Sequence, residues 1–246
     1  MLDKLNLTDP FALIIAIVMV VFILYEVIDG YKKGFLESGI RLIGYILLFV
    51  GSYILKNPLS VFLYTHLPFF KFGGLTSLNI IMYEALAFMI CIAVLSMVLS
   101  LVIKISGIIE KLLKLTIILA LPSKILGMIV GAIQAVVVLY VALFVVSMPV
   151  FNMPFLKESK YAKIILDKTP VMSQITNDAL KTFNEIAEFT KNEINIKDID
   201  TTNGKIVEIM LKNDIVTVDS VKLLNEKEKI RLTNLDELVN KYEEDK

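Results

Sequence analysis

Four long apolar segments, separated by polar ones, dominate the first 150 residues of the chain. Each approaches the length of about 20 residues that an α-helix needs to cross the hydrocarbon core of a bilayer. The pattern therefore predicts an all-α fold: an integral membrane four-helix bundle with interfacial helices and a mostly helical, soluble C-terminal tail. The predicted spanning helices cover about 11–28, 38–55, 79–103 and 125–147.

A polar stretch at 26–41 separates the first two apolar segments. Charges in hydrocarbon cost several kcal/mol each, so this stretch must reach the membrane surface and make the two helices a hairpin. We expect Glu26 and Asp29 to pair with its basic residues and to lock the hairpin. The hinge residues of interest are Gly30, Lys32, Lys33, Gly34, Phe35 and Arg41.

Two further segments are predicted to lie at the membrane surface. The segment 59–70 is rich in aromatic residues but too short to span, and Tyr and Phe favour the headgroup zone. The segment 105–121 is apolar but is interrupted by Glu110, Lys111 and Lys114, which favours an interfacial amphipathic helix over a span.

Charge divides the chain into a membrane region, 1–156, and a tail, 157–246. The first carries 10 Lys and Arg with 7 Asp and Glu, and the tail carries 15 with 18, although the whole chain has a net charge of zero. Apolar residues recur through the tail at helical spacing from Ile175 to Phe189, and a capped helix start is expected at 233–236. Asn203–Gly204 predicts an interruption of helical structure before Ile206, and a strand is predicted at 215–218.

The distribution of basic residues predicts the orientation of the bundle. Seven Lys and Arg follow the first and third helices, whereas three lie in the short segments of the opposite face. Because basic residues accumulate on cytoplasmic loops, both termini and the tail are expected on the extracytoplasmic side of the cell membrane.

The sequence contains no recognisable catalytic, cofactor or metal site. One histidine, His66, and one cysteine, Cys91, leave no metal-ligand spacing, and His66 is best interpreted as an ordinary surface residue. No nucleophile elbow or phosphate-binding loop is present, and no basic stripe suggests nucleic acid. A non-enzymatic protein is expected.

Glu84 is the candidate intramembrane polar site. Ionisable groups at membrane depth are costly and are often functional, but Glu84 lies within about a turn and a half of the predicted helix end. Both interpretations stay open. A small transporter or channel subunit would need a polar path through the bundle, and its candidates are Glu84, Asn79, Gln134, Ser96 and Ser100.

Gly127 and Gly131 form a GxxxG pattern, which permits close approach of two helix backbones in lipid. The sequence predicts a packing interface, either within the bundle or between copies. The second helix offers a partner face in Gly39, Gly44 and Gly51. Pro122-Ser123-Lys124 before this pattern is interpreted as a helix cap.

Three blocks of the chain resemble the CvpA family, the colicin V production proteins. The blocks are the hinge Gly30 to Phe35, the segment 121–134 with its Leu-Gly-x-x-x-Gly, and 159–170 with its Ser-x-x-Ala and Pro. The resemblance covers about residues 10–170 and implies a role in colicin V production or export, or in envelope maintenance. Some members carry an extracytoplasmic serine protease, but this tail has no histidine for such a triad.

We therefore interpret the chain as a non-enzymatic scaffold or accessory factor for toxin production and export or for envelope homeostasis. Its expected partners are the lipid bilayer, membrane or envelope proteins and a second copy of itself. The alternatives are the transporter or channel subunit using Glu84, and an enzyme whose active-site residues come from a partner.

Overall fold

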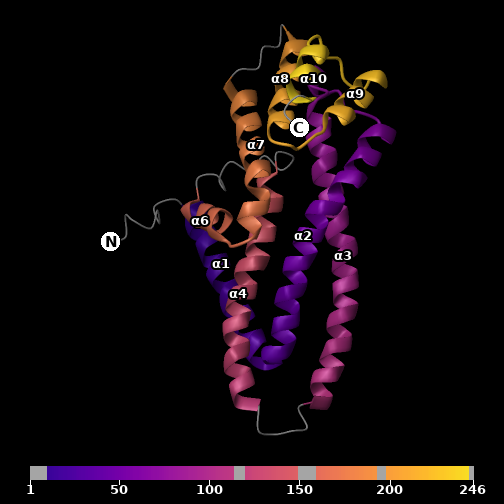
Figure 1. Ribbon diagram of the computed structural model, residues 1–246. Helices are drawn as coiled ribbons and strands as arrows, with labels where there is room; N and C mark the ends of the chain where they lie inside the picture. The colour runs from indigo at the N-terminus through magenta and orange to yellow at the C-terminus, as the bar shows by residue number, and fades with distance from the viewer. Residues whose placement is uncertain (1–9, 114–119, 149–158, 193–197, 244–246) are drawn as a thin grey trace. The chain divides into compact units, whose positions relative to one another are not determined.

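The computed structural model describes residues 10–113, 120–148, 159–192 and 198–243, and every regular element in these ranges is helical (Figure 1). The predicted all-α class is confirmed. The strand expected at 215–218 is wrong: residues 215–217 join α8 (Ile199–Lys212) to α9 (Val218–Glu226), and Val218 begins α9. Thr217 caps α9, because its side-chain oxygen accepts a hydrogen bond from the Ser220 N–H at 3.2 Å.

Four helices in the described part of the chain are long and apolar enough to cross a membrane. These candidate spans are Leu13–Lys33, Phe35–His66, Leu78–Lys104 and Pro122–Ser147. Large apolar side chains stay exposed along them; Leu47 is 65% exposed and Met97 is 70% exposed. Such surfaces suit lipid rather than water, so the chain is a membrane protein.

The chain forms two compact units, of which the first holds most of the apolar helix surface. It contains α1 (Pro10–Lys33), the first half of α2 (Phe35–His66), the second half of α3 (Leu78–Leu113), α4 (Ala120–Ser147) and the short helix α6 (Lys160–Lys168). Helices α1 and α4 lie side by side (Figure 1). Phe49 of α2 packs edge-on against Tyr140 and Phe144 of α4, with ring centroids 5.5 and 5.6 Å apart.

The turn between α1 and α2 is a single residue, Gly34, with a φ of 81° that favours glycine. The sequence predicted a longer polar hinge, but α1 continues to Lys33 and α2 begins at Phe35. Polar residues beyond the hydrocarbon can stay helical because the helix satisfies their backbone groups. The Gly34 N–H, for example, donates to the Gly30 carbonyl at 2.9 Å.

Helix α2 runs through Pro58 to His66, so its predicted end near residue 55 is wrong. A proline inside a helix removes one backbone hydrogen bond. At Pro58 the bond removed is the one to the Ile54 carbonyl, four residues earlier. The Ser60 hydroxyl adds a separate side-chain bond to the Asn57 carbonyl at 2.9 Å in the turn that follows. Most of the segment 59–70 is therefore a continuation of α2, and its depth at the headgroups stays a prediction.

The segment 105–121 is also helical where the structure describes its backbone. Helix α3 continues to Leu113, and α4 begins at Ala120. Residues 114–119 lie outside the described residues. The proposed interfacial position of this segment stays a prediction.

The second compact unit joins tail helices to part of the membrane hairpin. It contains the second half of α2, the first half of α3, the 3-10 turn η2 (Phe72–Gly74), most of α7 (Met172–Asn192), and α8, α9 and α10 (Leu235–Glu243). The predicted division at residue 156 does not follow these units. Long-range contacts explain the difference: the Asn203 side chain of α8 binds the chain between α2 and α3, whereas α6 packs in the first unit.

Asn203–Gly204 does not interrupt a helix, contrary to the prediction, because both residues lie inside α8. The Asn203 Oδ1 accepts from the Ser77 N–H at 3.1 Å and from the Ser77 hydroxyl at 2.7 Å, and its amide donates to the Gly74 carbonyl at 3.0 Å. A Cβ on Gly204 would come within 2.6 Å of the Asn234 Oδ1. Tertiary contacts, rather than a turn, explain this dipeptide: they need the amide group at 203 and leave no room for a side chain at 204.

Candidate functional site: a buried ion pair and a glycine seam

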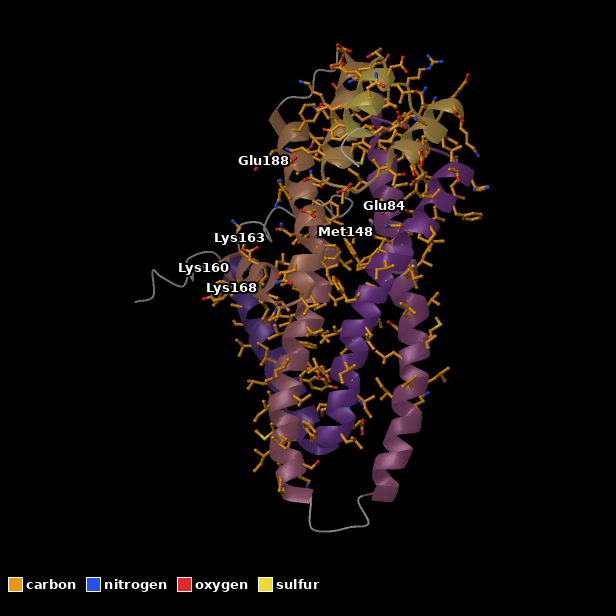
Figure 2. All side chains as sticks on the ribbon, viewed as in Figure 1. Glu84, Met148, Lys160, Lys163, Lys168 and Glu188 are labelled. Atoms are coloured by element: carbon orange, nitrogen blue, oxygen red, sulfur yellow. The ribbon has the colours of Figure 1, made fainter. Side chains whose placement is uncertain are left out.

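Glu84 of α3 is 6% exposed, and both of its carboxylate oxygens have partners on α2. The Lys56 ammonium lies 2.5 Å from Oε2, and the Ser60 hydroxyl donates to Oε1 at 2.5 Å. Lys56 and Ser60 are four residues apart and therefore share one face of α2. The side chain labelled Glu84 in Figure 2 lies between these two helices.

The Lys56 ammonium is itself well satisfied. It donates to the Asn57 Oδ1 at 3.0 Å and stands 5.1 Å from the centre of the Tyr53 ring. Its own side chain is only 10% exposed. A buried charge is tolerated when it is paired and hydrogen-bonded, so this cluster can hold α2 and α3 together.

The ion pair lies toward the far end of the membrane-spanning part of α2. Lys56 follows Leu42, the first residue after the polar hinge 26–41, by 14 residues, which corresponds to about 21 Å along a helix. The hydrocarbon core is about 30 Å thick. If α2 enters the core near Leu42, the Lys56–Glu84 pair lies about two thirds of the way across, beyond the midplane.

The other polar residues proposed for a path have local partners. The Asn79 amide group binds the Phe70 N–H and carbonyl, at 2.7 and 2.8 Å, and so fixes the turn before α3. Gln134 belongs to the first compact unit, where it donates to the Glu26 carboxylate at 2.5 Å. Ser100 donates to the Ser96 carbonyl one turn earlier on α3.

In the first unit, Gly127 and Gly131 of α4 face the backbone of α1. A Cβ on Gly127 would lie 3.0 Å from the Gly34 Cα, and one on Gly131 would lie 3.1 Å from the Glu26 carbonyl carbon. Gly30 lies opposite both glycines. We call this contact of Gly30, Gly34, Gly127 and Gly131 the glycine seam.

The partner face expected on α2 does not meet this pattern. Cβ atoms on Gly44 and Gly51 would instead approach Leu99 and Leu95 of α3, and a Cβ on Gly39 would have no heavy atom within 4 Å. The expectation that α2 supplies the partner face of Gly127 and Gly131 is wrong, because these glycines approach α1. The presence of glycines on both helices did not identify the contact.

Charged side chains around the Gly34 turn tie α1 and α2 together. Asp29 pairs with Lys33 and, at 3.2 Å, with Arg41, which also binds Glu37 at 2.9 Å. Lys32 is exposed. Unexpectedly, Glu26 does not join this group, because its carboxylate accepts from Gln134 of α4.

Ser123 serves the start of α2, although the sequence suggested a cap of its own helix. Its hydroxyl oxygen accepts from the Phe35 N–H at 3.0 Å, a group that has no partner inside α2. The neighbouring Lys124 ammonium lies 5.4 Å from the centre of the Tyr31 ring. Ser123 thus links α4 to the turn.

Among the described residues, no three His, Cys, Asp or Glu side chains are grouped so that they could hold a metal ion. His66 is exposed and stacks on Phe62, with ring centroids 4.4 Å apart. Cys91 is buried in α3. The expectation of a protein without catalysis therefore stays a prediction that this geometry does not oppose.

The tail contains a groove that no feature of the sequence indicates. Its volume is about 390 Å³, and it lies in the second unit among α7, α8 and α10. Its lining includes Phe189, Tyr242, Lys205, Lys212, Glu208 and Lys241. The hydrogen bond to Glu208 raises the pKa of the Lys241 ammonium, so that lysine stays charged. No local motif could predict the groove, because three separate helices form it.

A family model decides what kind of membrane protein this is. The model described as colicin V production protein matches residues 14–170, which is more than half of the chain. The chain belongs to the colicin V production protein family. Comparisons with curated proteins and with solved structures gave no significant match.

In this colicin V production family protein, the three blocks of resemblance all lie at helix contacts of the first unit. The hinge block supplies Gly30 and Gly34 of the glycine seam, and the second block supplies Gly127 and Gly131. In the third, Ser159 caps α6 and Ala162 is fully buried. These three blocks therefore build a packed helix arrangement. Lys56, Ser60 and Glu84 lie outside the three blocks, although the family match over residues 14–170 covers them.

Proposed function

We propose that this colicin V production family protein is a non-enzymatic membrane scaffold or accessory factor. It acts in toxin production and export or in envelope homeostasis, and its tail presents a surface to membrane or envelope proteins. The observation that carries the proposal is the anchoring of α8 on the α2–α3 hairpin through Asn203. Three hydrogen bonds of one buried side chain fix α8 to the connection between α2 and α3.

Further contacts in the second unit support the same proposal. The Lys229 ammonium donates to the Leu67 carbonyl at 2.9 Å and lies 5.5 Å from the centre of the Phe69 ring. Ile199 of α8 packs against Gly74. A tail held in this way offers a rigid platform, and rigid surfaces bind partners at a lower entropic cost.

The transporter alternative predicts a different role for Glu84. A carboxylate that carries an ion or proton must exchange partners, whereas both Glu84 oxygens are engaged by Lys56 and Ser60. This closed arrangement favours a structural role. It does not supply an open polar path.

A neutral replacement of the ion pair separates the two functions. Lys56→Met with Glu84→Gln removes both charges while keeping similar side-chain lengths and an amide oxygen for Ser60. A scaffold should retain toxin export or envelope integrity in a deletion strain when the variant accumulates normally. Loss of export by a normally accumulated, folded double variant would instead establish the transporter alternative.

The tail is proposed to be extracytoplasmic, on the strength of the basic residues near the turn and after α3. In a Cys91→Ser background, single cysteines at Ser173 and at Ser106 would be labelled in intact cells with a membrane-impermeant maleimide. Labelling of Ser173→Cys alone is expected. Labelling of Ser106→Cys alone would reverse the orientation and place the tail's partners in the cytosol.

A further inference from the structure

Helix α6 is a short amphipathic helix that packs on the membrane helices α1 and α4. The Ser159 side chain caps it, accepting from the Ala162 N–H at 3.4 Å. Ala162 is fully buried and shares a cluster with Met19 of α1 and Leu143 of α4. Partly buried residues around this cluster are Ile15, Leu139, Val146, Tyr161, Ile165 and Leu166.

These contacts place α6 near the boundary between hydrocarbon and headgroups. Leu143 lies four residues, or about 6 Å, before Ser147, where the apolar span of α4 ends. That span has 26 residues and is about 39 Å long, so it exceeds the hydrocarbon core of about 30 Å by roughly 4–5 Å at each end. A helix packed at Leu143 therefore lies within a few ångströms of the headgroup layer.

The outer side of α6 carries three lysines, Lys160, Lys163 and Lys168, all of them exposed (Figure 2). Asp167 is the single acidic residue of the helix, so this face has an excess of two positive charges. Ile164, which is 43% exposed, lies among them. Lysines around an exposed aliphatic side chain are typical of helices that lie in the membrane interface.

We propose that Lys160, Lys163 and Lys168 of α6 form a binding site for the headgroups of anionic phospholipids. The inference goes beyond the scaffold proposal and does not depend on it. At this depth the anionic groups within reach of a lysine are lipid phosphates, whereas an acidic protein segment would have to enter the headgroup layer. Zwitterionic lipids carry a compensating ammonium, so a net negative lipid such as phosphatidylglycerol is favoured. Ile164 would contact the upper acyl chain of the same lipid.

Lipid quenching in nanodiscs tests the proposal on the full chain. A fluorophore is attached at Ile164→Cys in a Cys91→Ser background, in nanodiscs of one fixed mixture of phosphatidylglycerol and phosphatidylcholine. Only the lipid that carries brominated, quenching acyl chains is changed. We expect the ratio of quenching by phosphatidylglycerol to quenching by phosphatidylcholine to be about fivefold higher than their mixing ratio, the factor that one lysine contributes near an anionic surface. The preference should weaken as salt is added.

Two variants with equal loss of charge provide the comparison. The α6 variant combines Lys160→Gln, Lys163→Gln and Lys168→Gln. In this variant the ratio of quenching by the two brominated lipids should equal the ratio in which the lipids are mixed. Lys181→Gln, Lys212→Gln and Lys227→Gln, three exposed tail lysines, should leave the preference intact. Helix content by circular dichroism would verify that both variants are folded.

Three results would overturn the proposal. Equal quenching by both brominated lipids in the parent protein would show that α6 does not select anionic lipid. An undiminished preference in the α6 variant would assign the selection to other residues. Loss of the preference on addition of millimolar inorganic phosphate, at constant ionic strength, would identify a site for a free anion.

Discussion

The glycine seam and the Lys56–Glu84 pair join helices within the membrane region in opposite ways. At the seam, α1 and α4 have no side chains between them, and a Cβ on Gly127 would meet the backbone of Gly34 at 2.8 Å. At the pair, α2 and α3 are joined by a charged contact of 2.5 Å between two long side chains. The first contact depends on the absence of atoms, and the second on the presence of opposite charges.

This difference affects what each contact tolerates. Lipid tails are as apolar as leucine, so close packing rather than hydrophobic attraction holds the seam, and any added side chain opposes it. The ion pair must instead offset the loss of hydration of two charges, and it fails when one partner is removed. The seam should therefore be sensitive to size, and the pair to charge balance.

The largest effect is expected at the seam. In Gly127→Leu the new side chain would overlap the α1 backbone, which cannot move aside as a flexible side chain can. Because even modest overpacking costs about 1–3 kcal/mol, we expect little or no folded, monodisperse protein after purification in detergent. Size-exclusion chromatography and thermal unfolding by circular dichroism measure this.

Gly39→Leu is the matched control, since a Cβ there meets no heavy atom within 4 Å. It should purify and unfold like the parent protein. Equal behaviour of Gly127→Leu and Gly39→Leu would contradict the seam and leave glycine without a packing role in α4.

A smaller but distinctive effect is expected at the ion pair. Lys56→Met alone or Glu84→Leu alone leaves one buried charge without its partner and should lower the free energy of unfolding by about 3–5 kcal/mol. The double variant removes both charges and should recover most of that loss. Unfolding of the parent protein and all three variants by a denaturing detergent gives the coupling energy, and additive losses would show that the two side chains do not act as a pair.

The smallest of the three effects is expected at the anchor of the tail. Asn203→Ala deprives the buried Ser77 N–H and hydroxyl of their acceptor, at a cost of about 1–3 kcal/mol. We expect faster hydrogen exchange in α8 and earlier protease cleavage of the tail, while α1 and α4 are unaffected. Asn240→Ala, at an exposed position of α10, is the control. Unchanged exchange in α8 would mean that Asn203 does not hold the tail.

The two contacts also differ in how far the sequence could predict them. The spacing of Gly127 and Gly131 marked a packing surface, but not its partner, because glycines occur on both α1 and α2. The predicted second helix ends at about residue 55, just before Lys56 and Pro58, because proline disfavours a helix interior. No local signal predicts that α2 continues and that Lys56 pairs with Glu84 of α3. Pairing across 28 residues is a tertiary property.

The tail shows the same limit. The apolar spacing from Ile175 to Phe189 correctly predicted α7, and the cap at 233–236 correctly predicted α10. Asn203–Gly204 resembled a turn because its local chemistry is that of turns. In the structure Ser77 and Gly74, which lie far away in the sequence, bind the Asn203 side chain, and the Asn234 Oδ1 leaves no room for a Cβ on Gly204.

In mechanical terms, the single-residue turn at Gly34 couples the motion of α1 directly to that of α2. One residue can span at most about 3.6 Å, so an axial displacement of α1 must move the start of α2 by nearly the same amount. Ser123 holds that start from α4, and the glycine seam holds the end of α1 to the same helix. A pull on any one of the three helices is therefore shared by the other two.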